Sequence, residues 1–294
     1  MPSELIEVQP HVSVWSDLSG IDLQQRMVLA GGARTRVLEA GEGRALVLVH
    51  GTGGHLEAYA RNVRELSQHF RLVLYDMLGH GYTDKPDRPY TIDVLSAHLL
   101  DVMDALGIER AYLSGESLGG WVAAWTAAHA PERVERLVLN TPGNIANKPE
   151  VMATVKHSSL QAVREASFES VRKRVEWLFY DKSLVTDELV RLRLAIYTQP
   201  GFERAMENIV AVQDWQYRAP FVWSPDWCGR IEAPTLLLWT DHDPTGGLDE
   251  AALLQEWIPG AQLSVIEGAG HWPQWEKPDE FNALHARFLK GERL

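Results

Sequence analysis

A serine stands in a five-residue pattern that is typical of a catalytic nucleophile. The G-x-S-x-G segment at 115–119 follows an apolar run at 111–114 and precedes a helical pattern of small residues at 121–124. A strand that turns sharply into a helix holds such a serine at the carboxyl edge of a sheet, where the helix N-terminus favours negative charge. The two glycines keep neighbouring atoms from clashing with the strained turn. The spacing therefore predicts Ser117 as a catalytic nucleophile.

A serine hydroxyl is a weak nucleophile, so Ser117 requires a histidine base that a carboxylate orients. In chains with this turn, the order along the sequence is serine, acidic residue, histidine. Among eleven histidines, His271 is the best placed, because it ends a glycine-rich segment that follows the apolar run 262–266. We therefore predict that His271 is the general base.

Two aspartates compete for the role of the orienting carboxylate. Asp241 and Asp243 both follow the apolar run 235–239. We favour Asp243, because it lies four residues past the end of that run, far enough for the chain to turn towards His271. Asp241 is more typical of a turn or a helix cap. The segment 241–243 also contains types of residue that bind metals, but no further ligand pair with metal spacing supports such a site. We expect neither a metal nor a cofactor.

The negative charge that develops on a substrate oxygen needs two preorganised N–H donors. The backbone N–H of Leu118, directly after the nucleophile, is the first candidate. The second is the backbone N–H of Thr52, in a glycine-rich loop at 50–55. Gly51 and Gly53 in that loop allow the backbone to approach a bound substrate closely, and we expect both to contact it.

The composition of the 294-residue chain restricts the class of partner. Its net charge of −12 argues against nucleic acid, because phosphate binding requires clustered lysine and arginine. Cys228 is the single cysteine, so no intrachain disulfide is expected, and we predict a packing role for it. The N-terminal residues lack the pattern of a secretory signal, and no run is long enough to span a membrane. These features predict a cytoplasmic protein that acts on a small molecule.

Apolar runs alternate with helical patterns along most of the chain, which indicates an α/β fold. Strands are expected at 27–29, 36–39, 45–50, 72–76, 110–115, 136–140, 235–239 and 262–266. Helices are expected at 56–68, 92–106, 117–129, 248–257 and 279–289. Near-continuous Val and Leu runs, as at 45–49, are typical of strands that are buried on both faces. The alternation predicts a mostly parallel, doubly wound sheet of eight strands with helices on both faces.

One region interrupts the alternation. Between Asn140 and Ile231 only helical patterns occur, at 160–180, 187–197 and 202–215. An insertion after the sixth strand lies above the carboxyl edge of the sheet, where ligands bind in open α/β sheets. We therefore predict a helical lid at 144–230, inserted into a core domain that comprises 26–143 and 231–294. Residues 1–25 are expected to be an irregular leader, anchored to the domain surface by Trp15.

The chain resembles the α/β-hydrolase superfamily in four features. They are the sharp turn around Ser117, called the nucleophile elbow, the loop at 50–55, the segment 76–81 and the order of the three catalytic residues. A narrower resemblance appears at 270–276 and in the lid at 180–193. Both segments are similar to the meta-cleavage-product hydrolases of bacterial aromatic and steroid degradation. Those enzymes cleave a carbon–carbon bond in a 2-hydroxy-6-oxo-hexa-2,4-dienoate. The resemblance implies the same fold, and it is compatible with a homodimer or homotetramer.

The narrower resemblance also implies roles for single residues. Ser117, Asp243 and His271 match the catalytic triad. Arg193 matches the lid arginine that binds the carboxylate and enol end of the dienoate, and a guanidinium suits a planar carboxylate. Trp272 matches the aromatic residue beside the catalytic histidine.

Three further side chains are expected at the substrate. Glu116 stands directly before the nucleophile, where the family usually has asparagine, and we expect it to face the substrate. A carboxylate there repels an anionic substrate unless it is protonated or turned away. Among the aromatic residues of the insertion, we expect Trp215 or Trp223 to face the substrate.

Two other functions use the same residues. A carboxylesterase or lactonase employs the same triad without tautomerisation, and it becomes the better interpretation if Arg193 faces solvent. A small-molecule receptor built on this fold binds a ligand without turning it over. A haloalkane dehalogenase is disfavoured, because it needs aspartate in place of Ser117.

Overall fold

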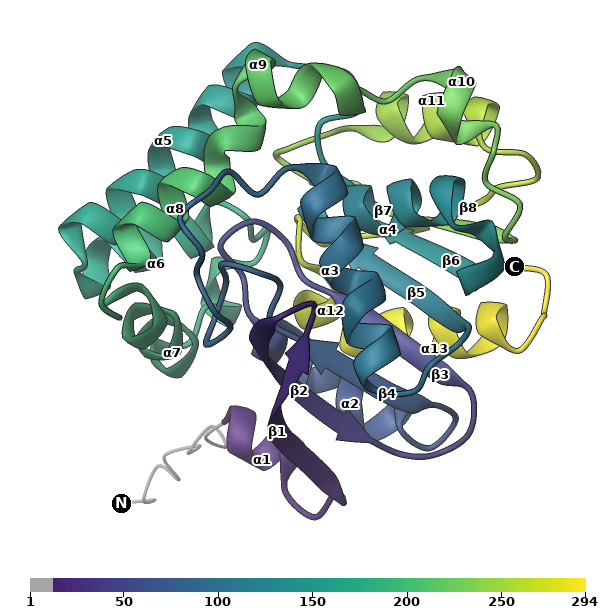
Figure 1. Cartoon of the computed structure of the whole chain (residues 1–294), viewed down its shortest axis with the longest axis horizontal. Coiled ribbons are helices and arrows are strands. Elements are labelled where there is room, and N and C mark those ends of the chain that lie inside the picture. Colours follow the sequence, from purple (N-terminus) through teal and green to yellow (C-terminus); the bar gives the residue numbers. More distant parts are fainter. Residues whose placement is uncertain (1–12) are drawn as a thin grey trace, which may run out of the picture.

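The computed structural model describes residues 13–294 and contains one sheet of eight strands in the order β1-β2-β4-β3-β5-β6-β7-β8 (Figure 1). Strands β1 and β2 form an antiparallel hairpin, β2 pairs antiparallel with β4, and all other neighbours are parallel. The strands are β1 (Leu23–Ala30), β2 (Ala33–Ala40), β3 (Ala45–Val49), β4 (Arg71–Tyr75), β5 (Ala111–Glu116), β6 (Val134–Asn140), β7 (Thr235–Thr240) and β8 (Gln262–Ile266). The predicted α/β fold with a mostly parallel eight-stranded sheet is confirmed.

Helices cover both faces of this sheet because its central strands are apolar on both sides. In β3, Leu46 and Leu48 join a buried cluster with α2 and α13, whereas Val47 and Val49 join the cluster of α3 and α4 on the opposite face. The helices of the core are α1 (Val14–Leu18), α2 (Ala60–Leu66), α3 (Ile92–Ala105), α4 (Leu118–His129), α11 (Leu248–Trp257), α12 (Pro273–Glu276) and α13 (Pro278–Leu289), with 3₁₀ turns η1 (Leu56–Tyr59) and η2 (Pro131–Arg133).

Six helices lie between β6 and β7 in the chain and form the helical insertion. They are α5 (Pro149–Glu165), α6 (Phe168–Glu176), α7 (Asp187–Tyr197), α8 (Phe202–Val210), α9 (Trp215–Arg218) and α10 (Pro225–Cys228), with 3₁₀ turns η3 (Lys182–Leu184), η4 (Ala211–Gln213) and η5 (Ala219–Phe221). Helices α5 to α8 are grouped together beside the sheet (Figure 1). Helix α7 has the bounds expected from the sequence, and Cys228 is buried in the core as expected.

The range 160–180, expected to be one helix, contains the end of α5 and the whole of α6. The chain leaves the helical conformation at Ala166, whose φ of 44° is left-handed, and Ser167 begins α6 with a reciprocal capping box to Ser170. Such a cap stabilises a new helix start and ends the old helix. Helix α5 also begins earlier than expected, at Pro149, whose fixed φ suits a first helical turn. The expectation of one continuous helix is therefore wrong.

The N-terminal segment differs from the expected irregular leader within the part that the structure describes. Helix α1 forms at its end, and β1 begins at Leu23, inside the stretch assigned to the leader. Trp15 does not anchor it, because this side chain is 73% exposed. The contact to the insertion is polar instead: the carboxylate of Glu188 accepts hydrogen bonds from the Ser13 hydroxyl and the Val14 N–H, each at 2.9 Å. The rest of the predicted leader, residues 1–12, lies outside the described residues.

Across residues 13–294, none of the helices combines the length and the apolar character that crossing a lipid bilayer demands.

Candidate active site

The turn between β5 and α4 holds Ser117 in a strained conformation. Its φ of 55° and ψ of −118° lie outside the regions that non-glycine residues favour, which costs about 1–3 kcal/mol. The turn closes only because its glycines lack side chains. A Cβ at Gly115 would lie 2.1 Å from the carbonyl oxygen of Gly119, and a Cβ at Gly119 would lie 2.2 Å from that of Val49. The predicted elbow geometry is therefore present at Ser117.

His271 and Asp243 form a buried hydrogen-bonded pair. The Nδ1 of His271 lies 2.9 Å from both carboxylate oxygens of Asp243, and the hydroxyl of Thr245 donates to Asp243 Oδ1 at 2.8 Å. The backbone N–H of His271 donates to the carbonyl of Leu178 at 2.7 Å, which ties the catalytic loop to the insertion. Burial opposes charge on the imidazole, but Asp243 and then Glu116 raise the pKa of His271 above its ordinary value.

Asp241, the competing carboxylate, has a different environment. It accepts a hydrogen bond from the N–H of Gly268 at 2.8 Å and pairs with Nδ1 of His242 at 2.8 Å. It therefore orders the loop that carries His271, as expected for a turn residue, and the structure brings Asp243 to the base instead. In the described part of the chain, no group of three or more His, Cys, Asp or Glu side chains is arranged to hold a metal ion.

Ser117 and His271 line one small cavity of about 20 Å³. The cavity is also lined by Gly51 and Thr52 of the glycine-rich loop at 50–55 and by Trp272. The insertion contributes Val155 from α5 and Arg174 from α6. No hydrogen bond joins the Ser117 hydroxyl to His271 in the described residues, and such bonds in unliganded sites are often long. The Nε2 of His271 instead lies 3.2 Å from Oε1 of Glu116.

Glu116 is buried directly beside the nucleophile. Burial raises the pKa of Glu116 to about 7, and the nearby His271 and Arg193 cations limit that rise. A side chain at Gly51 would meet Oε2 of Glu116 at 2.5 Å, so the glycine leaves room for this carboxyl group. Glu116 lines the cavity, and its contact is with the catalytic histidine.

The two expected oxyanion donors are the backbone N–H groups of Thr52 and Leu118. Thr52 lines the cavity, and Leu118 begins α4 directly after the nucleophile, so its N–H is among the unpaired donors of a helix start. Gly53 does not line the cavity: its carbonyl accepts a hydrogen bond from the Tyr197 hydroxyl at 3.1 Å. Gly53 therefore contacts helix α7, and the substrate contact expected there stays a prediction.

Arg193 points inward from α7 and is almost completely buried. The guanidinium carbon lies 5.1 Å from the centre of the Trp272 ring and 5.8 Å from that of Tyr197. Its Nε has no hydrogen-bond partner among residues 13–294. A buried donor without a protein partner is costly, so a polar group of a bound ligand or water is a favourable partner for it. Arg193 itself does not line the small cavity, but Trp272, against which it stacks, does.

Trp215 and Trp223, which we expect near the substrate, do not line this small cavity. Trp215 is 59% exposed on α9, where its ring lies 5.5 Å from the guanidinium of Arg218. Trp223 is buried, stacks on Trp121, and donates to the carbonyl of Gly143 at 3.0 Å. This hydrogen bond supports the segment that follows β6, next to the nucleophile.

Sequence reasoning missed Arg174, which lines the cavity from α6. It stands in the run Arg172-Lys173-Arg174, which resembles a solvated helix face. The available signal was its helical register, because Arg174 lies three residues after Val171 and four before Leu178, and both of these are buried. Thr245, Val155 and Leu178 are further lining residues that the sequence did not identify.

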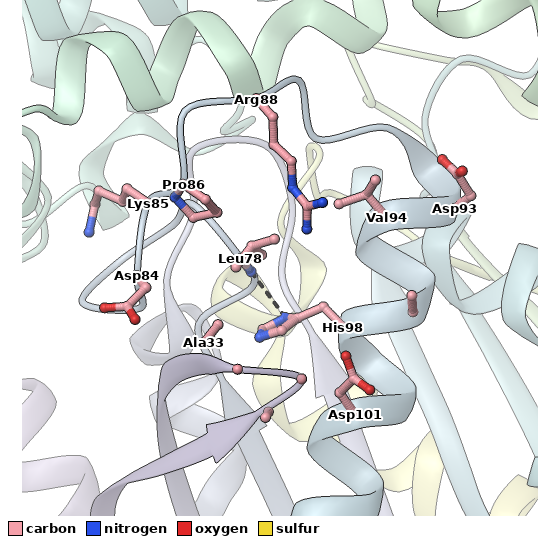
Figure 2. Close-up of a pocket in the computed structure, with 14 residues that line it drawn as sticks. Ala33, Leu78, Asp84, Lys85, Pro86, Arg88, Asp93, Val94, His98 and Asp101 are labelled. Atoms are coloured by element: carbon pink, nitrogen blue, oxygen red, sulfur yellow. Dashed lines mark hydrogen bonds between the residues drawn. The ribbon is translucent and has the colours of Figure 1, made fainter.

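A separate cavity of about 650 Å³ lies between the β1–β2 turn and the start of α3 (Figure 2). It contains none of the predicted catalytic residues. Its histidine, His98, accepts a hydrogen bond from the N–H of Leu78 at 3.1 Å and contacts the Thr35 hydroxyl at 2.8 Å. Burial lowers the pKa of His98 to about 4, so this ring is a neutral structural group.

Comparisons with known proteins identify the family to which the chain belongs. The family described as alpha/beta hydrolase fold matches residues 44–278. A 2-hydroxy-6-oxo-2,4-heptadienoate hydrolase from Pseudomonas putida is 36% identical, over 91% of this chain and 96% of that protein. The chain belongs to the meta-cleavage product hydrolases of the α/β-hydrolase family. A 2-hydroxy-6-oxo-6-phenylhexa-2,4-dienoate hydrolase from Comamonas testosteroni is also 36% identical, over 86% of this chain and 90% of that protein.

The similarity extends to solved structures of this family. A crystal structure of a variant of the meta-cleavage product hydrolase CumD superposes with a TM-score of 0.80 at 33% identity. The match covers 90% of this chain and 97% of that chain. The resemblance inferred from the lid and histidine segments is therefore confirmed, and the protein is a hydrolase.

Proposed function

We propose that this hydrolase cleaves the C5–C6 bond of a 2-hydroxy-6-oxo-hexa-2,4-dienoate with Ser117 as its nucleophile. The observation that carries the proposal is that Ser117 and His271 line one cavity and that Asp243 pairs with the imidazole of His271. The names of the relatives support the substrate class, because they describe hydrolases of such dienoates.

We assign a residue to each step. Arg193 binds the dienoate carboxylate, and His271 assists the transfer of the enol proton to C5, which gives the 2,6-diketone. Ser117 then attacks the C6 carbonyl while the N–H groups of Leu118 and Thr52 stabilise the oxyanion. The C5–C6 bond breaks, the dienolate leaves, and water releases the acyl group from Ser117 with His271 as base.

The helical insertion acts in this scheme as a lid, with residues 144–230 covering a core of 26–143 and 231–294. A cavity of about 20 Å³ holds little more than one water molecule, so the side chains that line it, several of them from the insertion, must move apart when a dienoate binds. The raised pKa of Glu116 supports a neutral carboxyl group beside an anionic substrate. The oligomeric state stays a prediction of a homodimer or homotetramer, which light scattering will test.

The test is to mix the purified protein with a yellow dienoate. We expect the colour to fade, with 2-hydroxypenta-2,4-dienoate and a carboxylic acid as products in mass spectrometry. The Ser117→Ala variant is the control and leaves the colour unchanged. No fading by the wild type, together with brisk turnover of p-nitrophenyl esters, would favour the carboxylesterase or lactonase. Labelling of Ser117 by a fluorophosphonate without turnover of any substrate would favour a receptor.

A further inference from the structure

The second buried arginine of the cavity, Arg174, has no role in the reaction described above. It belongs to α6 of the helical insertion, is only 4% exposed, and lines the cavity together with Ser117 and His271. Its neighbour Lys173 on the same helix is exposed and pairs with Glu169 at 3.3 Å. The two residues therefore differ in environment although they are adjacent in sequence.

The guanidinium of Arg174 is incompletely satisfied. Its Nε donates to the hydroxyl of Ser159 at 3.3 Å, and its carbon lies 5.3 Å from the centre of the Trp177 ring. Its Nη1 is buried without a hydrogen-bond partner, and no carboxylate of residues 13–294 lies within ion-pair distance of it. Burying a cation without a partner is expensive, so the site is built for an anion that this chain does not supply.

The charges around the cavity indicate how many anionic groups it accepts. Two buried arginines, Arg174 and Arg193, face this region without carboxylate partners. Asp243 is engaged by His271, and Glu116 has a pKa near 7, so neither neutralises both guanidinium groups. Burial lowers the pKa of Arg174 only to about 10, which leaves it charged at neutral pH. One guanidinium binds one planar carboxylate with two hydrogen bonds, so two arginines fit a dianion.

We propose that Arg174 binds a second carboxylate, carried by the acyl side of the substrate, and thereby selects dienoates with an anionic acyl chain. The inference rests on the proposed function, in which Arg193 takes the carboxylate of the dienoate end. Arg174 lines the cavity beside the nucleophile, where the acyl group lies once Ser117 has attacked C6. Val155 and Leu178 complete this wall with apolar contacts suited to a methylene chain.

The reaction on such a substrate balances with water alone. For 2-hydroxy-6-oxonona-2,4-dienedioate, the C5–C6 bond breaks, a proton is added at C5 and a hydroxyl group at C6. The products are 2-hydroxypenta-2,4-dienoate, with five carbons, and butanedioate, with four. The second carboxylate takes no part in bond breaking and contributes only to binding, through Arg174.

The experiment compares this dioate with 2-hydroxy-6-oxonona-2,4-dienoate, which has the same carbon chain and a terminal methyl group in place of the second carboxylate. We expect the wild type to show a kcat/KM about a hundredfold higher for the dioate, since buried charge-assisted hydrogen bonds discriminate strongly. In Arg174→Met, kcat/KM for the dioate falls by about the same factor, and that for the methyl compound is unchanged or higher. Arg174→Lys keeps the charge and retains part of the preference, and Lys173→Met is the control that retains all of it.

A second readout separates this inference from the proposed function. Binding of both compounds to Ser117→Ala, followed by their visible absorbance, gives their relative affinities without turnover. Absence of hydrolysis of either compound by the wild type would overturn the proposed function, and tighter binding of the dioate would still support the anion site. Equal affinities, or an equal loss of kcat/KM on both compounds in Arg174→Met, would overturn the role of Arg174 in substrate selection.

Discussion

Glu116 is predicted to destabilise the folded protein at neutral and alkaline pH. Its pKa of about 7 in the fold lies above the ordinary value of 4.5 because the carboxyl group is buried. A carboxyl group with a raised pKa favours folding fully below pH 4.5, and that contribution is lost as the pH rises through 7. The pKa rises by about 2.5, from 4.5 to about 7, and each unit is worth about 1.36 kcal/mol, so the free energy of unfolding falls by about 3 kcal/mol between low and high pH. Most of this fall occurs between pH 5 and pH 8.

Glu116→Gln removes this titration while preserving the shape of the side chain. We expect the free energy of unfolding of the variant, relative to the wild type, to increase by about 2–3 kcal/mol between pH 5 and pH 8. Reversible denaturant unfolding at the two pH values measures it. Glu42→Gln, in the exposed turn between β2 and β3, is the control and shows no such change. A difference between Glu116→Gln and wild type that is the same at both pH values would show that burial does not penalise this carboxylate.

Two further pairs of variants separate the residues of the site from their neighbours. Asp243→Asn is expected to lower kcat by about 10⁴-fold because the histidine loses its orienting carboxylate. Asp241→Asn is expected to cost about 1 kcal/mol of stability with kcat within a few-fold of wild type, and equal effects of the two changes on kcat would argue against the assignment. Gly119→Ala places a Cβ 2.2 Å from the carbonyl of Val49 and is expected to destabilise the fold by about 1–3 kcal/mol or more. Gly143→Ala, whose Cβ has ordinary contacts of 3.6 Å or more, is expected to stay within about 0.5 kcal/mol in the same denaturation assay.

The sequence predicted the sheet and the elbow well because both depend on local signals. Apolar runs such as Ala45–Val49 are buried on both faces, which leaves no alternative to a central strand. At the elbow, the backbone around Gly115 and Gly119 leaves no room for a side chain, so the two glycines of the motif predict the tight turn directly. The preference for Asp243 over Asp241 followed from how far the chain must travel to reach His271.

The insertion was harder to predict because its helices depend on contacts between segments. The end of α5 at Ala166 is set by the Ser170 capping box, which is a weak signal inside a continuous helical pattern. Aromatic residues serve cores, surfaces and pockets alike, so the sequence did not separate exposed Trp215 from buried Trp223. The inward orientation of Arg174 becomes evident only when α6 packs over the cavity.

The most direct measurement is a crystal structure of Ser117→Ala with a bound 2-hydroxy-6-oxo-dienoate. We expect the dienoate carboxylate to accept hydrogen bonds from Arg193. The C6 carbonyl carbon is expected beside the position that the Ser117 oxygen occupies in the wild type, with the carbonyl oxygen facing the N–H groups of Leu118 and Thr52. A ligand bound outside this cavity, or with C6 turned away from residue 117, would contradict catalysis by Ser117.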